Sequence, residues 1–272
     1  DCAHGAAYEI GPKLLHKFGA NVVLTGIVPD GYNINHKCGS VHPQHMTAMV
    51  KKHNADLGIG LDGDADRVVL ADAYGNIVDG DGILYVLAVN AQSNNRLTEG
   101  IVGTVMTNYG LERACEERGI AFERSNVGDR FVLEKMHAKN WILGGETSGH
   151  IIQLDKSTTG DGLLTAISVL KVMHSTGRAL ADLVSDLQIY PQRTVNVPIN
   201  GSVTAARLME DETVVNAVEE AESTLDCNGR VVLRPSGTEP VIRVMVEGND
   251  VDQVEMLVKS LAMAVESSST KC

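Results

Sequence analysis

The sequence is poor in aromatic residues, which make up 4% of its 272 positions and include a single tryptophan. Alanine, valine, leucine and glycine supply most of the apolar and small positions instead. That balance favours α/β layers with closely packed helices over a β-sandwich. Hydrophobic residues still reach 43% of the chain, so its length allows packed cores in one large or two to three small domains.

Paired cysteines and long apolar runs are also missing. The five cysteines are odd in number, scattered, and show no C-x-x-C spacing, which is typical of reduced thiols in the cytoplasm. No segment approaches the roughly 20 consecutive apolar residues of a membrane span, and no charged-then-apolar signal segment opens the sequence. We therefore expect a cytoplasmic protein with no membrane partner.

Positive charge is scarce, because 23 lysines and arginines face 35 acidic residues and leave a formal net charge of −12. Such a surface field repels nucleic acid, so no nucleic-acid partner is expected. An anionic substrate would need loops that are locally positive.

Apolar periodicity predicts alternating helices and strands over the first two thirds of the chain. The predicted helices cover 6–18, 43–52, 80–91, 111–118, 130–138 and 160–173, and the predicted strands cover 21–25, 57–61, 68–72, 101–104 and 121–124. After residue 191 the pattern changes to an α+β tail, with strands over 194–199, 230–233 and 241–247 and helices over 213–225 and 251–265. In the last helix, packing on a sheet is predicted by an apolar stripe of Val254, Leu257, Val258, Leu261 and Val265.

Three carboxylates follow a predicted apolar strand, in the segment Asp-Gly-Asp-Ala-Asp-Arg at 62–67. Asp62, Asp64 and Asp66 repel one another at a strand end unless a cation or an arginine neutralises them. Their hard oxygen ligands suit Mg²⁺ or Ca²⁺, and Arg67 could steer a phosphate onto the metal. An EF-hand is disfavoured, since its glycine position holds Arg67. A solvated acidic turn is the alternative without a ligand.

A second loop, Gly-Gly-Glu-Thr-Ser-Gly-His at 144–150, also follows a short apolar strand. Its glycines, Gly145 among them, let the backbone approach a ligand closely. Glu146 and Ser148 can hydrogen-bond adjacent sugar hydroxyls, while His150 can donate to a phosphate or exchange a proton near neutral pH. A structural turn with a histidine satisfied in the core is the alternative.

Two further segments carry arginines suited to anions. Arg130 opens a predicted helix after Gly128-Asp129, where it could contact an anion. The segment Arg-Pro-Ser-Gly-Thr-Glu-Pro at 234–240 lies between two predicted strands, and its hydroxyls, backbone N–H groups and flanking guanidinium groups fit a phosphate dianion. The residues of this predicted cradle are Arg234, Ser236, Gly237, Thr238 and Arg243. A hairpin connection without a ligand is the alternative.

Together these loops resemble the metal loop (62–67), sugar loop (145–150) and phosphate loop (234–240) of the α-D-phosphohexomutase superfamily, in order and in spacing. The segments 75–81, 104–112 and 127–130 are most similar to the branch that acts on glucosamine phosphates. The resemblance implies an α/β fold of consecutive domains with mixed sheets, followed by a smaller α+β domain. The implied domains are 1–77 with the metal loop, 78–191 with the sugar loop and 192–272 with the phosphate loop.

The resemblance also implies a reaction. A phosphoserine coordinated to Mg²⁺ passes its phosphoryl group to glucosamine 6-phosphate, and the bound 1,6-bisphosphate then turns over. Its other phosphate returns to the serine and leaves glucosamine 1-phosphate, a precursor of UDP-N-acetylglucosamine. Glucosamine 1,6-bisphosphate, or an activator of the glucose 1,6-bisphosphate type, is implied as a cofactor.

Each loop has an implied role in that reaction. The three aspartates of the metal loop would hold Mg²⁺, and Arg67 would stabilise the charge on the transferring group. Glu146 and Ser148 would grip the 3- and 4-hydroxyls of the sugar. The phosphate loop and Arg243 would hold whichever phosphate is not reacting, so that its binding energy positions the other one.

The phosphoserine is expected in a first domain, within a Ser-His-Asn type loop, and no such tripeptide occurs in this sequence. The sequence opens with Asp1 rather than methionine, in a segment typical of a strand that enters a helix. We therefore expect a fragment that is inactive alone. The resemblance leaves a homodimer open.

Three other interpretations stay open. A phosphomannomutase or phosphoglucomutase of the same superfamily would use the same loops on a different sugar. A haloacid-dehalogenase-type phosphatase would use Asp62 as its nucleophile, but it leaves the phosphate loop unexplained. The chain could also be a non-catalytic sugar-phosphate binding module. Within the superfamily, His150 is a candidate general base or serves only as a phosphate ligand.

Overall fold

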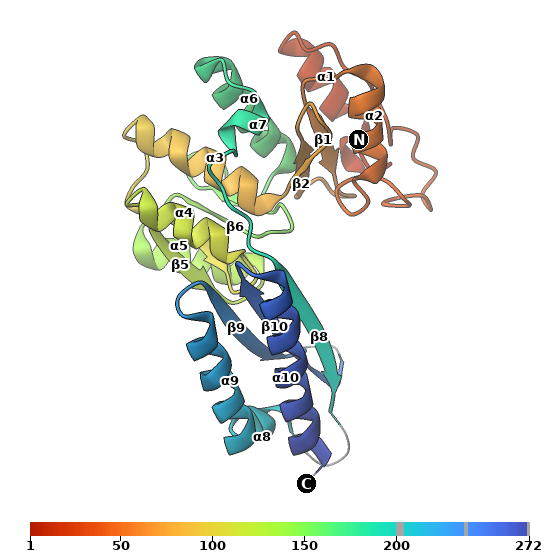
Figure 1. The fold of residues 1–272 in the computed structure, drawn as a ribbon. Helices are drawn as coiled ribbons and strands as arrows, with labels where there is room; N and C mark the ends of the chain where they lie inside the picture. Colours follow the sequence, from red (N-terminus) through yellow and green to blue (C-terminus); the bar gives the residue numbers. More distant parts are fainter. Residues whose placement is uncertain (200–203, 237–238, 271–272) are drawn as a thin grey trace. The chain divides into compact units, whose positions relative to one another are not determined.

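The computed structural model describes residues 1–199, 204–236 and 239–270 of the chain (Figure 1). Contacts between residues divide the fold into two units. The first unit comprises Asp1–Thr107 and Leu111–Gln188, and the second comprises Asn108–Gly110 and Ile189–Cys272.

The first unit opens with short helices and an antiparallel sheet. Its elements are η1 (Ala6–Tyr8), α1 (Ile10–Lys17), α2 (Gln44–His53), β1 (Gly58–Leu61), β2 (Val68–Ala71) and β3 (Ile77–Val78). The strands pair in the order β1-β2-β3. Helix α2 begins directly after Pro43, whose fixed φ suits a helix start, and it buries Met46 and Val50 against Ala71 of the sheet.

Two predictions for the N-terminal segment are wrong. The helix predicted over 6–18 is divided at Glu9 into η1 and α1. The residues 21–25, predicted to form a strand, carry no strand in the described structure. There Thr25 accepts a hydrogen bond from the N–H of Cys2, but a strand exists only where a partner supplies a continuous ladder, and β-branched residues alone do not create one.

The rest of the first unit is an α/β arrangement around a mixed sheet. Its elements are α3 (Gly80–Ser93), β4 (Gly100–Thr104), α4 (Tyr109–Glu117), β5 (Ala121–Ser125), α5 (Asp129–Lys139), β6 (Leu143–Gly145), β7 (Ile151–Gln153), α6 (Gly162–Thr176) and α7 (Leu180–Leu183). The strand order is β5-β4-β6-β7, in which β4 runs parallel to both neighbours and β7 runs antiparallel to β6. The mixed sheet implied by the resemblance is thus confirmed here.

One hydrophobic core joins the two sheets of the first unit. It contains Leu70 of β2, Ile83 of α3, Ile101 of β4 and Val169 of α6, all with no exposed surface. Because the strands that flank the metal loop and the sugar loop share this core, packing fixes the two loops relative to each other.

The second unit is an α+β fold. Its elements are β8 (Gln192–Pro198), α8 (Ala205–Met209), α9 (Glu212–Leu225), β9 (Gly229–Pro235), β10 (Val241–Gly248) and α10 (Val251–Thr270). The strands pair antiparallel in the order β8-β10-β9, and α9 and α10 pack on this sheet (Figure 1). All residues of the stripe predicted in the last helix are buried, so that prediction is confirmed. Among the described helices, none combines the length and apolar character that a membrane span requires.

Asn108 ties its short segment to the rest of the second unit through hydrogen bonds to Tyr190 and Glu247. Its Nδ2 donates to the carbonyl of Tyr190 (3.0 Å) and to Oε1 of Glu247 (3.3 Å), and its Oδ1 accepts from the N–H groups of Tyr190 (3.0 Å) and Gly110 (2.9 Å). The fully buried Glu247 is neutralised by Arg230 of β9, at 2.6 Å. This buried polar network fixes Asn108 within the second unit.

Candidate active site

The metal loop joins the antiparallel strands β1 and β2, whose last residue pair is Leu61 and Val68. Ala65 adopts a left-handed conformation (φ 64°), which is uncommon for a residue with a Cβ. Hydrogen bonds fix this turn: the Ala65 N–H donates to the carbonyl of Asp62, and the Ala65 carbonyl accepts from Gly162 at the start of α6. The loop is therefore anchored both to its own strand and to a helix of the shared core.

This turn brings the predicted metal ligands together. One carboxylate oxygen from each of Asp62, Asp64 and Asp66 lies within 4.8 Å of the others. Asp62 is buried, Asp64 is exposed and Asp66 is intermediate, so the cluster is open to solvent on one side. A cation that enters from that side would meet three oxygen ligands at once, which suits Mg²⁺ or Ca²⁺.

The electrostatics of the loop favour a cation. The pKa of Asp62 is raised to about 6: burial is the largest cause, the N–H of Arg67 opposes it by donating to Asp62 (3.1 Å), and the neighbouring Asp66 and Asp64 add to the rise. The Nε of Arg67 lies 3.8 Å from Asp62 and 3.7 Å from Asp66. Oδ1 of Asp66, the oxygen that Arg67 approaches, is buried without a hydrogen bond among the described residues. A carboxylate oxygen without a hydrogen bond and a disfavoured charge on Asp62 fit a divalent cation as the group that would satisfy both.

The sugar loop joins the antiparallel strands β6 and β7. Its N–H groups close the turn, since Glu146 donates to the carbonyl of His150 (3.0 Å) and Gly149 donates to the carbonyl of Glu146 (2.9 Å). Gly149 has φ 94°, a conformation that favours glycine. Gly145 ends β6, where a Cβ would lie 2.9 Å from the carbonyl oxygen of His150. The loop backbone thus depends on both glycines.

The side chains predicted to contact a sugar stay at the surface of this loop. Ser148 is exposed and Glu146 is partly exposed. Oε1 of Glu146 accepts a hydrogen bond from the N–H of Gly128 (2.8 Å), at the start of α5. That bond orients one carboxylate oxygen, while the other remains available for a donor such as a hydroxyl.

The metal loop and the sugar loop are in direct contact. Nδ1 of His150 lies 3.0 Å from Oδ2 of Asp66, and the N–H of Val68 donates to the carbonyl of Gly149 (3.1 Å). The approach is so close that a Cβ on Gly149 would lie 2.1 Å from the Val68 carbonyl oxygen. The structure therefore joins two loops that lie more than 80 residues apart in the sequence into one site.

His150 occupies the buried side of this contact rather than the open side. It is 5% exposed, its ring lies against the backbone of Gly160, and its Nε2 has no hydrogen-bond partner among the described residues. An ionised carboxylate only accepts hydrogen bonds, so Nδ1 is the protonated nitrogen when it bonds to Asp66. In this geometry the imidazole orients a metal-loop carboxylate, a relation that sequence spacing did not indicate.

Two residues at the start of α3, Gly80 and Asp81, support the sugar loop, although neither was predicted as a site residue. Oγ1 of Thr147 donates to the carboxylate of Asp81 (3.0 Å), which is 1% exposed in α3. The N–H of Gly80 donates to the Thr147 carbonyl (3.1 Å), and a Cβ on Gly80 would lie 2.0 Å from the carbonyl oxygen of Glu146. The only signal in the sequence was the Asp-Gly-Asp at the end of the segment 75–81.

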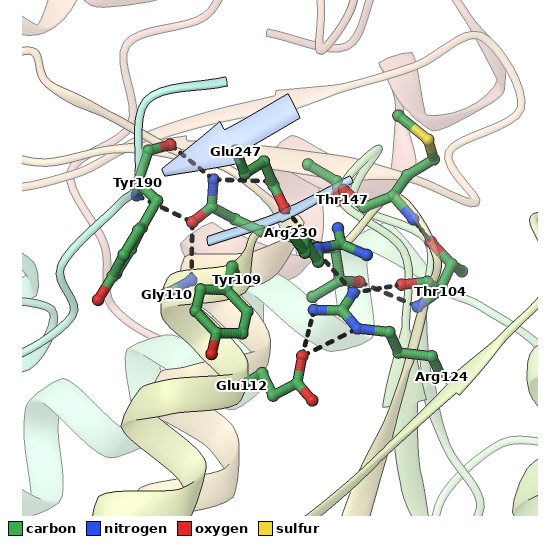
Figure 2. A network of polar contacts seen from close by, with 12 residues as sticks. Thr104, Tyr109, Gly110, Glu112, Arg124, Thr147, Tyr190, Arg230 and Glu247 are labelled. Atoms are coloured by element: carbon green, nitrogen blue, oxygen red, sulfur yellow. Dashed lines mark hydrogen bonds and ion pairs between the residues drawn. The ribbon is translucent and has the colours of Figure 1, made fainter. Parts of the chain in front are cut away.

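The turn after β4 is held beside the same loop. Nη1 of Arg124 donates to the carbonyls of Thr104 (2.8 Å) and Thr107 (2.7 Å), and its Nε and Nη2 bind Glu112 (Figure 2). Within the segment 104–112, singled out for its resemblance, one arginine from β5 thus binds Thr104, Thr107 and Glu112. Thr147 also reaches this turn, at 3.4 Å from the carbonyl of Met106.

Arg130 lies apart from these contacts. It stands in the first turn of α5 with a side chain that is 80% exposed, and it pairs with Glu134 at 2.7 Å. The residue from this segment that contacts the sugar loop is Gly128, through its backbone N–H. A role for Arg130 in anion binding remains a prediction.

The phosphate loop belongs to the second unit, where it joins β9 to β10. Arg234 and Arg243 are directly opposite each other on these strands. Burial, and next the charge of Arg243, lowers the pKa of Arg234. Nη2 of Arg243 lies 3.5 Å from the Ser236 hydroxyl and 3.7 Å from Glu239, while its Nε is buried with no hydrogen bond within the described ranges.

Like charges directly opposite in a sheet repel each other, so this hairpin carries a surplus of positive charge and of hydrogen-bond donors. A phosphate would supply the missing counter-charge and acceptors. Gly237 and Thr238, the other residues of the predicted cradle, lie outside the described residues.

Comparison with known proteins defines the class to which this arrangement belongs. Models of the phosphoglucomutase/phosphomannomutase family match almost the whole chain: α/β/α domain II at residues 1–75, α/β/α domain III at 79–190 and the C-terminal domain at 195–264. The chain belongs to this family of phosphohexomutases.

Within the family, curated relatives at about half identity are named phosphoglucosamine mutase. The protein of Thioalkalivibrio sulfidiphilus is 49% identical over 98% of this chain, and that of Halorhodospira halophila is 50% identical over 99%. The chain spans 59% and 58% of their respective lengths.

Solved structures share the fold at lower identity. A phosphoglucomutase/phosphomannomutase family protein from Burkholderia thailandensis superposes with a TM-score of 0.78 at 21% identity, over 98% of this chain and 59% of its own. The N-acetylphosphoglucosamine mutase of Aspergillus fumigatus, solved in complex with GlcNAc-6P and magnesium, gives 0.74 at 22% identity, over 97% and 64%.

Proposed function

We propose that these domains serve a phosphoglucosamine mutase, a cytoplasmic isomerase that interconverts glucosamine 6-phosphate and glucosamine 1-phosphate. The observation that carries the proposal is the contact between the metal loop and the sugar loop through Asp66 and His150. This contact supports the proposal because it brings the carboxylates proposed to hold a cation beside a loop with an exposed serine and a partly exposed carboxylate, as a phosphoryl transfer to a sugar hydroxyl requires. The relatives of Thioalkalivibrio sulfidiphilus and Halorhodospira halophila, both named phosphoglucosamine mutase, favour glucosamine as the sugar.

In this proposal Asp62, Asp64 and Asp66 hold Mg²⁺, the ion with which the Aspergillus fumigatus enzyme was solved. When bound, the ion neutralises charge on the transferring phosphoryl group. Arg67 lies at the same cluster with a half-exposed side chain and can add its own positive charge there. His150 keeps Asp66 in place, and its buried position makes orientation rather than proton exchange its main task.

The remaining residues bind and orient the sugar phosphate. Glu146 and Ser148 accept and donate hydrogen bonds to adjacent hydroxyls, which are presented similarly in both orientations of a bound 1,6-bisphosphate. Arg234, Ser236 and Arg243, together with the backbone of the phosphate loop, bind the phosphate that is not reacting. Their binding energy then holds the other phosphate close to the metal loop.

The reaction also needs a phosphoserine and a 1,6-bisphosphate to charge it. By resemblance the phosphoserine belongs to the superfamily's first domain, and the matched family models are those of the other domains. The activity is accordingly proposed for the complete protein in which a phosphoserine and these loops act together.

The test is a mutase assay on the protein expressed from its complete gene, with Mg²⁺, glucosamine 6-phosphate and a trace of glucose 1,6-bisphosphate. Phosphorus NMR should show conversion to glucosamine 1-phosphate, and an Asp62→Asn variant should lose it. Release of inorganic phosphate without isomerisation would instead identify a phosphatase, with Asp62 as its nucleophile. Binding of glucosamine 6-phosphate with neither reaction would identify a binding module.

A further inference from the structure

A polar pocket lies in the first unit, between α3, α6 and the turn that follows β7. Its volume is about 70 Å³, several times the roughly 10–15 Å³ that a single water requires. The charged and hydroxyl or amide side chains that line it include Arg96, Gln153, Asp155, Lys156, Ser168 and Lys171. Cationic groups outnumber carboxylates here, in a protein with a formal net charge of −12.

The floor of the pocket has hydrogen-bond donors without acceptors. Gln153 is 4% exposed, and its Nε2 has no hydrogen-bond partner in the part of the chain that the structure describes. Its Oε1 accepts from the ammonium of Lys156, which also donates to the hydroxyl oxygen of the 8% exposed Ser168 (3.1 Å). The Gln153 amide is thus a buried donor in the pocket lining without an acceptor in the described structure, and Ser168, which accepts from Lys156, still has a hydroxyl proton to donate.

The rim of the pocket carries more positive than negative charge, with Arg96, Lys156 and Lys171 against Asp155. The pKa of Lys156 is lowered, first by burial and then by the neighbouring charges of Arg96 and Lys171, against the effect of Asp155. Three cationic side chains thus converge on one small space and repel one another. An anion with several acceptor oxygens would satisfy the donors of the floor and the charges of the rim together.

This pocket is separate from the loops of the candidate active site. Helix α6 begins at Gly162, which contacts the metal loop, whereas Ser168 and Lys171 stand six and nine residues further along. At 1.5 Å per residue they lie about 9 and about 14 Å down the helix axis. Likewise β7 starts beside His150 and ends at Gln153, so the pocket occupies the far end of elements that begin at the loops.

We propose that this pocket is a second anion site, which binds a phosphate group independently of the proposed sugar-phosphate site. The phosphate is either a free ion or the terminal group of a small phosphomonoester. The acceptor oxygens of the phosphate bind Gln153 Nε2, the Ser168 hydroxyl and the ammonium of Lys156, and Arg96 and Lys171 supply the remaining counter-charge.

The experiment is a titration of the isotope-labelled 272-residue chain with inorganic phosphate at constant ionic strength, followed by NMR on the side-chain amide of Gln153. That resonance should shift and saturate. In Lys156→Gln/Lys171→Gln the affinity at this resonance should fall about tenfold or more. Lys51→Gln/Lys52→Gln removes the same charge from α2 and should leave the titration unchanged. Unaltered spectra elsewhere and equal melting temperatures establish that the variants fold.

A Gln153 resonance that does not respond, or that responds equally in the Lys156/Lys171 variant, would overturn the proposal. Shifts restricted to residues of the phosphate loop, such as Ser236, would overturn it as well, because they would show binding at the other site only. Titration with glycerol phosphate distinguishes the sources. Equal affinity indicates the terminal phosphate of an ester, and loss of binding indicates the free ion.

Discussion

Nδ1 of His150 lies 3.0 Å from Oδ2 of Asp66, although 84 positions separate the two residues in the chain. This hydrogen bond joins the loop proposed to hold the metal to the loop proposed to hold the sugar. A buried imidazole that holds this carboxylate in one orientation would preorganise the proposed metal site before any ion arrives.

Removal of that imidazole should weaken metal binding. His150→Ala is expected to lower the affinity for Mg²⁺ about 10- to 100-fold, the usual cost of losing a partner that orients a metal ligand. His150→Asn, whose amide can donate to Asp66 from a similar position, should recover part of the loss. Isothermal titration with Mg²⁺ measures both, with His137→Ala in the last turn of α5 as the matched control. An unchanged affinity in His150→Ala contradicts the positioning role.

The raised pKa of Asp62, about 6, predicts how Mg²⁺ stabilises the protein at different pH values. A folded-state pKa above the unfolded value means that ionised Asp62 costs stability above about pH 6, and that protonation removes this cost as the pH falls. A bound cation offsets the cost only where the carboxylate is ionised. Saturating Mg²⁺ should therefore raise the melting temperature by about 2–4 °C more at about pH 7.5 than at about pH 5.5.

Scanning fluorimetry at both pH values provides that comparison. Asp62→Asn should abolish the Mg²⁺-dependent shift at each pH. Equal shifts of the wild-type protein at the two pH values would show that Asp62 does not govern the site.

Because the metal loop and the sugar loop approach each other closely, one added methyl group at Gly149 should lower the free energy of unfolding by an unusually large amount. Gly149→Ala combines a strained φ of 94° with a Cβ that would lie 2.1 Å from the Val68 carbonyl oxygen, so it should destabilise the first unit by about 2–4 kcal/mol. Gly177→Ala is the matched control, since Gly177 also has a positive φ but opens to free space, and it should cost about 1 kcal/mol. Urea denaturation measures both. Similar losses would show that backbone strain alone, and not the contact between the loops, sets the cost.

Arg234 and Arg243 lie opposite each other beside the phosphate loop, so replacing Arg234 should weaken ligand binding without lowering the stability of the fold. Without a ligand, Arg234→Gln removes a repulsion from Arg243 and should leave the melting temperature unchanged or higher. The same variant should bind glucosamine 6-phosphate at least about tenfold more weakly, because a charge-assisted bond to phosphate is lost. Arg193→Gln, in β8 and paired with the exposed Glu255, should change neither quantity much. If Arg234→Gln lowers stability but not affinity, the cradle is structural.

The loops could be predicted from the sequence because their signals are local. Apolar strands such as 57–61 and 68–72 end at glycine-rich or acidic segments, and that pattern needs no knowledge of tertiary contacts. The short elements β3, β7 and α8 were missed, since two to five residues carry too little periodicity to be recognised.

Contacts between distant segments could not be predicted in the same way. The bond from His150 to Asp66 and the support of Thr147 by Asp81 arise only when β2, β6 and α3 pack into one core. Sequence reasoning placed His150 toward a phosphate because imidazole chemistry allows it, whereas burial against Gly160 decides its direction. The sequence therefore indicates which chemistry a side chain can perform, whereas the direction in which the side chain points depends on tertiary packing.

The most direct test of the proposed function is the specificity of the protein expressed from its complete gene, measured as kcat/KM for glucosamine 6-phosphate, glucose 6-phosphate and mannose 6-phosphate with Mg²⁺. The account predicts isomerisation of all three at the same loops, with a clear preference for glucosamine 6-phosphate. A preference for glucose or mannose 6-phosphate would contradict the proposed substrate and indicate a sister phosphohexomutase activity.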